Sequence, residues 1–267
     1  MKLNSLIEPV AALTAAAGRA ILEVYATDFE VETKSDNSPL TRADLASHHT
    51  LVAGLRGLTP DTPIISEEGG LPEFAERSAW TRYWLIDPLD GTKEFVNRNG
   101  EFTVNVSLIE DHRPVFGVVH APVQDKTYVG CSGHGAELRV ADGAPRPIRV
   151  AGRSSDPVRV VGSRSHRGAS LDAFLERVGE TDMVPMGSSL KFCVVAEGLA
   201  DVYPRLGPTS EWDTAAAQAV VEQAGGRVLR LDGKPLSYNE KEDILNPYFV
   251  VAGPADQDWL ALLAAGE

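Results

Sequence analysis

Apolar residues near the start of the chain recur at steps of three and four residues. The series is Leu6, Val10, Leu13, Ala17, Ile21 and Val24. This spacing places the apolar side chains along one face of an α-helix. The segment therefore predicts a helix that packs one side against a core. We do not expect a secretory signal, because Asn4, Glu8 and Pro9 interrupt the apolar stretch that such a signal needs.

The middle of the chain predicts a second helix followed by strands. Residues 33–41 are rich in turn-forming types, and a helix is expected from about residue 43 to residue 55. Two short apolar runs, at 63–65 and 83–86, stop abruptly at carboxylates. Between 102 and 109 apolar and polar residues alternate, which predicts a half-buried strand. Further strands are expected at 115–119 and 127–129.

Strand and helix patterns alternate in the second half. The expected strands are 158–162, 182–186, 201–203, 227–229 and 248–252, and the expected helices are 169–178, 188–197, 213–224 and 255–265. Such alternation is typical of a layered α/β arrangement. We therefore expect an α/β protein in which an α+β N-terminal half (1–150) and an α/β C-terminal half (151–267) form one compact unit. Residues 141–157 are expected to connect the halves.

Composition and charge narrow the function. The chain has 267 residues, 43% of them hydrophobic, and we identify no apolar run near the length that crosses a bilayer. Its formal charge of −13 disfavours nucleic-acid binding, which rewards clustered Lys and Arg. The two cysteines, Cys131 and Cys193, form no metal or disulfide spacing, so packed thiols and a reducing cytosol are expected.

The clearest candidate chemistry lies within residues 84–92, Trp-Leu-Ile-Asp-Pro-Leu-Asp-Gly-Thr. Asp87 is expected to end an apolar strand, because Pro88 cannot extend the ladder of hydrogen bonds. The turn that follows can bring together Asp87, the carbonyl of Leu89 and Asp90. Ligands that offer only oxygen suit a hard cation such as Mg²⁺.

The next two residues, Gly91 and Thr92, predict the start of a helix. Its backbone N–H groups and the Thr92 hydroxyl are suited to an anion. The alternative is purely structural, with Asp90 serving only as the cap of this helix.

Two further acidic sites strengthen the metal hypothesis. Glu67 and Glu68 follow the apolar run at 63–65, and adjacent acids there are unfavourable without a counterion. Asp213 stands at the start of an alanine-rich helix, where the alternative role is that of an N-cap. Ligands gather at the carboxyl ends of strands in α/β proteins, and three such transitions here end in acids.

In this order, the acid pair, the DPLDGT segment and the distant Trp-Asp pair resemble the inositol monophosphatase superfamily of Mg²⁺-dependent, lithium-sensitive phosphatases. The resemblance spans nearly the whole chain and implies a layered αβαβα sandwich with two to three Mg²⁺ ions. The metal ligands that it implies are Glu67, Asp87, the Leu89 carbonyl, Asp90 and Asp213. The catalytic residues that it implies are Asp44, Thr92 and Glu67. Glu68 is implied as an acid that supports the ligands without binding the metal itself.

A longer match, including residues 90–105, 163–166, 187–193 and 203–209, resembles the 3′(2′),5′-bisphosphate nucleotidases. These enzymes convert adenosine 3′,5′-bisphosphate, a by-product of sulfate assimilation and phosphopantetheine transfer, to AMP and phosphate. The substrate-binding residues implied are Glu67, Leu89, Asp90, Gly91, Thr92, Ser163, His166, Gly187, Lys191, Arg205 and Asp213.

Physical arguments support some of these residues. Lys191 is expected in the first turn of a helix that begins at Ser188, where a cation and free N–H groups act together on a phosphate. Arg205 can add a forked pair of donors, and His166 can stack on a base. Each is also compatible with an ordinary solvated surface residue.

The resemblance implies attack by water without a phosphorylated enzyme, and a small bisphosphate nucleotide as the partner. Alternatives are an inositol or sugar monophosphatase, and a non-catalytic sensor of metal or nucleotide. We expect a cytoplasmic protein without an integral membrane segment, more often monomeric than dimeric. Peripheral association with the cytoplasmic face of the inner membrane stays open.

Overall fold

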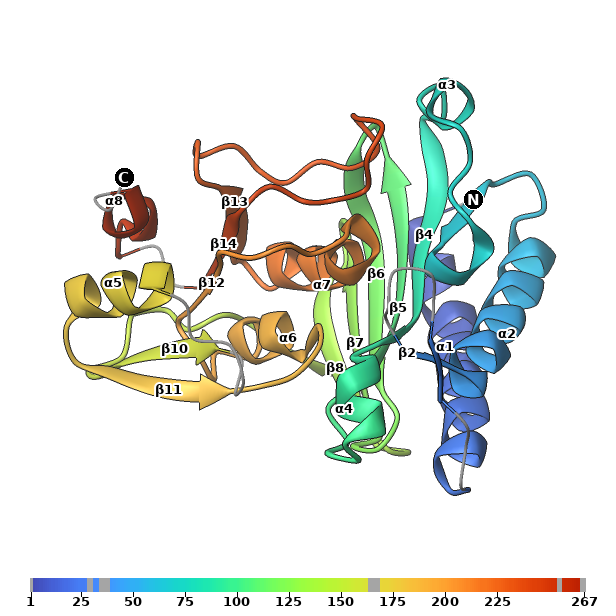
Figure 1. Cartoon of the computed structure of the whole chain (residues 1–267), viewed down its shortest axis with the longest axis horizontal. Helices are drawn as coiled ribbons and strands as arrows, with labels where there is room; N and C mark the ends of the chain where they lie inside the picture. Colours follow the sequence, from blue (N-terminus) through green and yellow to red (C-terminus); the bar gives the residue numbers. More distant parts are fainter. Residues whose placement is uncertain (1, 28–30, 34–38, 163–168, 254–255, 265–267) are drawn as a thin grey trace.

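The computed structural model describes residues 2–27, 31–33, 39–162, 169–253 and 256–264. Two large sheets organise this part of the chain (Figure 1). The larger has the order β3-β4-β5-β6-β7-β8-β9, with bounds Ile64–Ser66, Arg82–Asp90, Thr103–Glu110, Arg113–Ala121, Lys126–Cys131, Gly135–Val140 and Arg146–Pro147. Strands β3 and β4 are parallel, and every later neighbouring pair is antiparallel.

The smaller sheet has the order β11-β10-β12-β14-β13. Its strands are Thr181–Pro185, Val158–Gly162, Val202–Arg205, Phe249–Ala252 and Arg227–Arg230 in that order. The first three are parallel, whereas β14 runs antiparallel to both of its neighbours. A separate antiparallel pair is formed by β1 (Val31–Thr33) and β2 (Pro39–Thr41), and β2 lies inside the segment 33–41 that was expected to be a turn.

Helices separate and cover the two sheets in five layers. The helices that form these layers are α1 (Ile7–Tyr25), α2 (Arg42–Leu58), α5 (Ala169–Val178), α6 (Leu190–Ala196), α7 (Glu211–Gln223) and α8 (Trp259–Ala264). Single helical turns are η1 (Leu3–Leu6), η2 (Glu67–Gly69), α3 (Phe74–Arg77) and α4 (Thr92–Val96). Helices α1 and α2 cover the outer face of the larger sheet, α6 and α7 lie between the sheets, and α5 and α8 cover the smaller sheet (Figure 1). The expected αβαβα sandwich is confirmed.

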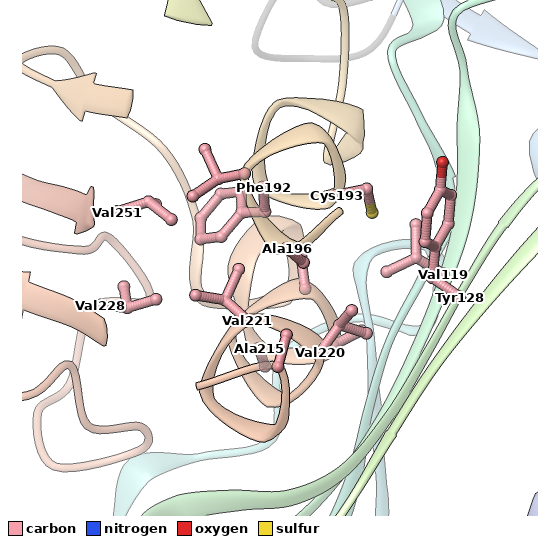
Figure 2. Close-up of a cluster of buried hydrophobic side chains, with 14 of the residues drawn as sticks. Val119, Tyr128, Phe192, Cys193, Ala196, Ala215, Val220, Val221, Val228 and Val251 are labelled. Carbon is pink, nitrogen blue, oxygen red and sulfur yellow. The ribbon is translucent and has the colours of Figure 1, made fainter. Parts of the chain in front are cut away.

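The central core fills the layer between the sheets. Figure 2 shows Val119 and Tyr128 of the larger sheet against α6 and α7, and Val228 and Val251 of the smaller sheet on the other side of these helices. Because α7 packs on both sheets, the two halves of the chain share one core. The division near residue 150 stays a prediction.

The strand predicted between residues 102 and 109 is buried on both faces, not on one. Its even-numbered residues, such as Val104 and Val106, join the core under α1 and α2. Its odd-numbered polar residues Thr103, Asn105 and Ser107 are also buried, at 0–1% exposure. The expectation of a half-buried strand was wrong, because helices cover the second face as well. Strands β8 and β9 were not predicted, and β9 lies in the segment expected to be a connection.

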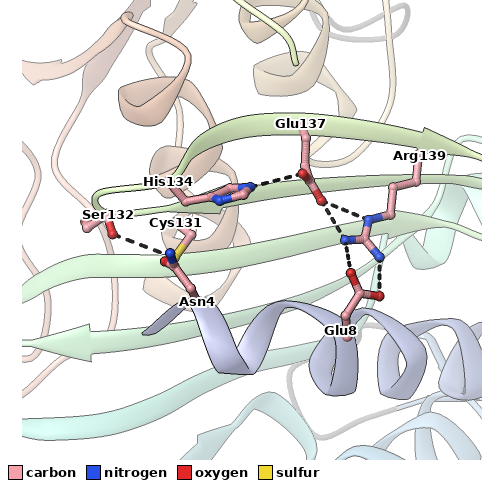
Figure 3. Close-up of polar contacts among 7 residues, drawn as sticks. All are labelled: Asn4, Glu8, Cys131, Ser132, His134, Glu137 and Arg139. Carbon is pink, nitrogen blue, oxygen red and sulfur yellow. Dashed lines mark hydrogen bonds and ion pairs between the residues drawn. The ribbon is translucent and has the colours of Figure 1, made fainter. Parts of the chain in front are cut away.

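The N-terminal helix packs as its spacing predicts. Leu6, Val10, Ala17 and Ile21 are at 0% exposure in the core between α1, α2 and the larger sheet. By length and composition Leu3–Tyr25 could nevertheless cross a membrane, a property that the search for apolar runs overlooked. Polar contacts also hold α1 to the larger sheet (Figure 3), where Arg139 of β8 binds both carboxylate oxygens of Glu8, at 2.8 and 2.7 Å.

Both cysteines are buried free thiols, as expected. Burial raises the pKa of Cys131 and of Cys193, so neither is a reactive thiolate.

Candidate active site

Two parallel strands bring the first acidic motifs together. Ser66 of β3 pairs with Ile86 of β4, so the residues that follow, Glu67 and Asp87, lie next to each other at the carboxyl end of β3. Strand β4 was expected to end at Asp87, but it continues through a β-bulge to Asp90. The bulge accommodates the proline that lies within it, because a bulged residue does not need to donate to the ladder.

Asp87 lies at the centre of a group of acids that we call the carboxylate cluster. Its members are Asp44, Glu67, Asp87, Asp90 and Asp213. Asp87 is 1% exposed, and its Oδ1 accepts a hydrogen bond from the backbone N–H of Leu89 at 3.0 Å. Burial, followed by the charges of the other four members, raises the pKa of Asp87 well above its ordinary value.

Asp213 joins the cluster from the first turn of α7. Ser210 is the N-cap of this helix, and Asp213 is its third residue. The carboxylate accepts hydrogen bonds from the Ser210 backbone N–H (2.9 Å) and the Thr209 hydroxyl (2.7 Å), as in a capping box. The N-cap role considered for Asp213 is therefore wrong. Burial and the charges of Asp90 and Glu67 raise its pKa to about 7, although both hydrogen bonds oppose this.

Of the residues expected to handle water, Asp44 and Glu67 belong to the cluster, and Thr92 follows its member Asp90 by two residues. Gly91 has a φ of 93°, which is unstrained only for glycine, and α4 begins directly after it at Thr92. Asp90 provides no side-chain cap for α4, so the capped-turn alternative is not supported. Asp44 is 2% exposed in the first turn of α2. The side chain of Leu89 is buried in the core beneath that helix.

A pocket of about 710 Å³ opens beside the cluster. Asp90 and Asp213 form part of its wall, together with the cationic side chains of Lys93, Lys191 and Arg205. The volume lies in the range of nucleotide-sized and drug-sized sites. Acidic and cationic side chains therefore line the same cavity.

The pocket cations have partners in the protein. Helix α6 begins at Leu190, two residues later than expected, and the Lys191 ammonium donates to the backbone oxygen of Ser188 at 3.0 Å. A guanidinium N–H of Arg205 donates to the Pro208 carbonyl, while Nε of Arg205 is buried without a partner in the described chain.

Three other residues that were expected to bind substrate are not found in the described lining of the pocket. The N–H of Gly187 donates to Glu101 at 2.8 Å, and Gly187 is absent from the described lining of the pocket. Ser163 and His166 lie outside the described residues.

The oxygen atoms in and around the carboxylate cluster are of the chemical type that binds a hard cation. Thr103 and Asn105 pair across β4 and β5 with Asp90 and Asp87, and each has a buried oxygen without a hydrogen-bond partner in the described chain. These oxygens and the crowded carboxylates are the kind of ligand that Mg²⁺ prefers. As they stand, however, no three His, Cys, Asp or Glu side chains among the described residues are grouped so as to hold a metal ion. One oxygen on each of Asp87, Asp90 and Asp213 is instead held by the protein.

Sequence reasoning missed several residues of this site. Asn105 looked like a solvent-facing position of a half-buried strand, and Ser189 was only part of a longer motif. An unexplained polar residue in an apolar strand was the one available signal for Asn105. Lys93 and Thr209 also line the pocket.

The fold and this site define the class of protein. The chain belongs to the inositol monophosphatase family, whose model matches residues 2–265, and it is an enzyme of the phosphatase class.

More specific relatives are bisphosphate nucleotidases. The chain is 49% identical over 257 residues to the 3′(2′),5′-bisphosphate nucleotidase CysQ of Escherichia coli O157:H7, covering 92% of this chain and 99% of the relative. It is 39% identical to the protein of the same name from Aggregatibacter actinomycetemcomitans, covering 95% of each.

Solved structures agree with this relationship. The crystal structure of CysQ from Bacteroides thetaiotaomicron superposes with a TM-score of 0.81 at 38% identity, covering 93% of this chain and 98% of that one. The suhB protein of Bartonella henselae, at 23% identity and a TM-score of 0.80, shows the shared fold alone.

Proposed function

We propose that this chain removes the 3′-phosphate of adenosine 3′,5′-bisphosphate to give AMP and phosphate. The observation that carries this proposal is the 49% identity to a named 3′(2′),5′-bisphosphate nucleotidase over 99% of that relative's length. The pocket supports it, because a substrate with two phosphates needs cationic side chains in addition to a metal site, and Lys93, Lys191 and Arg205 line this pocket. Lys191 and Arg205 are the side chains proposed for that second phosphate, with Lys93 close to them on the wall.

The proposed metal ligands are Glu67, Asp87, the Leu89 carbonyl, Asp90 and Asp213, holding two or three Mg²⁺ ions. When bound, these ions would offset the charge of the carboxylates and stabilise the negative charge that develops at phosphorus. Without these ions, the carboxylate cluster of an enzyme with a formal charge of −13 would repel its anionic substrate.

The chain's own residues are proposed to handle the water molecule that attacks phosphorus. The Thr92 hydroxyl orients this water, and Asp44 or Glu67 accepts its proton. The water oxygen forms a bond to phosphorus as the bond to the ribose 3′-oxygen breaks, so no phosphorylated side chain forms. Hydrolysis in ¹⁸O-labelled water should place the label in phosphate. A trapped phosphoenzyme would contradict this mechanism.

The substrate assignment is tested by phosphate release from two esters at saturating MgCl₂. We expect kcat/KM for adenosine 3′,5′-bisphosphate to exceed that for inositol 1-phosphate at least about 100-fold, because missing hydrogen bonds and charge pairs cost several kcal/mol. The reverse ratio would identify an inositol or sugar monophosphatase. Release no faster than from buffer alone would identify a non-catalytic sensor.

We also propose that the chain acts in the cytoplasm as a monomer. The acidic balance supports the location, since 38 acidic residues against 25 basic ones disfavour the anionic surface of a membrane. The mass of the purified protein, measured by light scattering during gel filtration, tests the monomer.

A further inference from the structure

Ser189 lies where four elements of the active site meet. It precedes α6 and is 2% exposed. Its backbone N–H and its hydroxyl each lie 2.6 Å from Oδ2 of Asp90, at the end of β4. The same hydroxyl lies 2.8 Å from the backbone oxygen of Asp213 in α7.

The usual task of a serine at this position is absent. A serine that precedes a helix normally caps it by accepting a hydrogen bond from a backbone N–H in the first turn. Ser189 makes no such side-chain bond to α6. Its hydroxyl is turned toward two proposed metal ligands instead.

Asn105 restricts the direction of the Ser189 hydroxyl proton. Asp90 Oδ2 and the backbone oxygen of Asp213 are both acceptors, and a hydroxyl has only one proton to share between them. The third neighbour, the side-chain amide of Asn105 on β5, donates its Nδ2–H to the Ser189 oxygen at 2.8 Å. That bond occupies a lone pair of Ser189 and leaves its proton for the acidic side.

Asn105 is itself fixed by the sheet. It is 1% exposed and stands directly opposite Asp87 across β4 and β5. Residues paired in this way point to the same face of a sheet. The bonds therefore lead from β5 through Ser189 to Asp90 and α7, without a solvent-exposed step.

We infer that Ser189 is a positioning residue for the metal site, and that Asn105 holds its hydroxyl in the required orientation. This rests on the proposed function, because Asp90 and Asp213 are taken as ligands. In the described chain, both hydrogen bonds to the Asp90 side chain end on Oδ2. Ser189 thus holds Oδ2, so Oδ1 is the oxygen that we assign to the metal, and the Ser189 hydroxyl lies between β4 and α7.

The test measures binding of Mg²⁺ alone, without substrate, from the rise in Tm across a series of MgCl₂ concentrations. A ligand that binds only the folded state stabilises it according to its concentration relative to Kd. We expect Ser189→Ala to raise the apparent Kd for Mg²⁺ about tenfold, as replacement of groups that orient metal ligands commonly does. The substrate KM at saturating MgCl₂ should stay within about threefold, because Ser189 is not assigned to the substrate.

Ser107→Ala is the matched control. The Ser107 hydroxyl is also fully buried, comes from β5, and donates to the backbone oxygen of Phe116 at 2.9 Å, with no carboxylate involved. The two alanine variants should lose similar Tm in the absence of metal, but only Ser189→Ala should change the Kd. An equal change in Ser107→Ala would make the effect one of general stability and overturn the inference.

Asn105→Ala tests the second part of the inference, the role of Asn105. It should weaken Mg²⁺ binding, and the Ser189→Ala/Asn105→Ala double variant should be no weaker than Ser189→Ala, because Asn105 acts through Ser189. Independent, multiplying effects would overturn this order of action. Ser189→Thr, which keeps a hydroxyl, should return the Kd to within about threefold of the wild type.

The outcomes separate this inference from the proposed function. A wild-type protein stabilised by MgCl₂ together with an unchanged Kd in Ser189→Ala overturns the inference alone. A wild-type protein with no response to MgCl₂ overturns the assignment of the metal ligands, and the inference with it.

Discussion

Asp87 carries its carboxylate where water is nearly excluded and where its charged neighbours include four further acids. Such a group destabilises the folded protein unless a proton or a cation compensates its charge. The charge of Asp87 should therefore destabilise the metal-free protein, whereas the metal-bound protein needs that charge to hold its ion.

Asp87→Asn should distinguish the effect of this charge on stability from its effect on activity. In metal-free protein the Tm should be unchanged or higher, because an amide of the same shape removes the repulsion. At saturating MgCl₂ the rate of phosphate release should fall at least about 100-fold, since a lost ligand removes several kcal/mol of charge stabilisation. Calorimetry and the phosphate assay on one preparation check both. Asp182→Asn, an exposed acid of β11, makes the same change of charge and should keep the wild-type rate.

His120 gives a pH dependence in the acid range. Burial lowers its pKa to about 4, helped by Arg19 and opposed by Asp125. The folded state thus keeps His120 neutral while the unfolded chain, with an ordinary pKa near 6.5, takes up a proton. The contribution of His120 is complete above pH 6.5 and is lost as the pH falls toward 4, by about 1.4 kcal/mol per pH unit.

Urea unfolding at pH 7.5 and pH 5.5, above the isoelectric point of about 4.9, measures this loss. Between these values the wild type should lose about 1.4 kcal/mol more stability than His120→Gln, which cannot be protonated. Parallel pH profiles for the two proteins would show that His120 titrates normally in the folded state.

At the scale of elements, two glycines determine how closely α7 approaches the larger sheet. Gly117 of β6 and Gly130 of β7 are partners in register. A Cβ on Gly117 would lie 2.3 Å from the backbone oxygen of Ala216, and one on Gly130 would lie 2.5 Å from the backbone of Ala219. The helix that carries Asp213 therefore rests on bare backbone.

Gly117→Ala should force α7 away from the sheet. We expect a loss of about 3 kcal/mol of stability, as in overpacked cores, and at least a tenfold lower rate because Asp213 moves with the helix. Gly57→Ala, on the exposed side of α2 with no atom within 4 Å of the added Cβ, should instead gain up to about 1 kcal/mol. Urea unfolding and phosphate release test both variants. Equal stability of the two would show that the sheet and helix can shift without cost.

Local patterns predicted most elements because the apolar periodicity of a helix or strand is visible within a short stretch of chain. They could not reveal what covers each face, so the polar side of β5 was taken as exposed. Glu67, Asp87 and Asp90 were singled out because they follow short apolar runs, and Asp213 because it stands near the start of a helix, whereas Asp44 came only from the family resemblance. The bond from Asn105 to Ser189 spans 84 residues and has no local signature, so only the folded arrangement reveals it.

At the scale of the whole molecule, charge governs which surfaces the protein meets. A formal charge of −13 opposes adsorption to anionic lipid, although Leu3–Tyr25 has the length and composition of a membrane-spanning helix. The apolar face of α1 is occupied by the core of the larger sheet.

Flotation with vesicles that contain anionic lipid checks this balance. At low salt the folded protein should remain in the unbound fraction. Recovery of most of the protein with the vesicles would indicate that α1 leaves the core to reach the bilayer. A variant with Leu6→Ala and Val10→Ala, which weakens the docking of α1, should bind more than the wild type if that route exists.

Asp213 follows Asp90 by 123 residues and enters the cluster on a helix that starts at Glu211. A nascent chain still on the ribosome cannot complete the centre until α7 has left the exit tunnel, even if the larger sheet is already folded. Partly synthesised or truncated products that end before this helix should therefore be inert toward cellular phosphate esters. Turnover in a cell extract would then count only chains translated beyond α7.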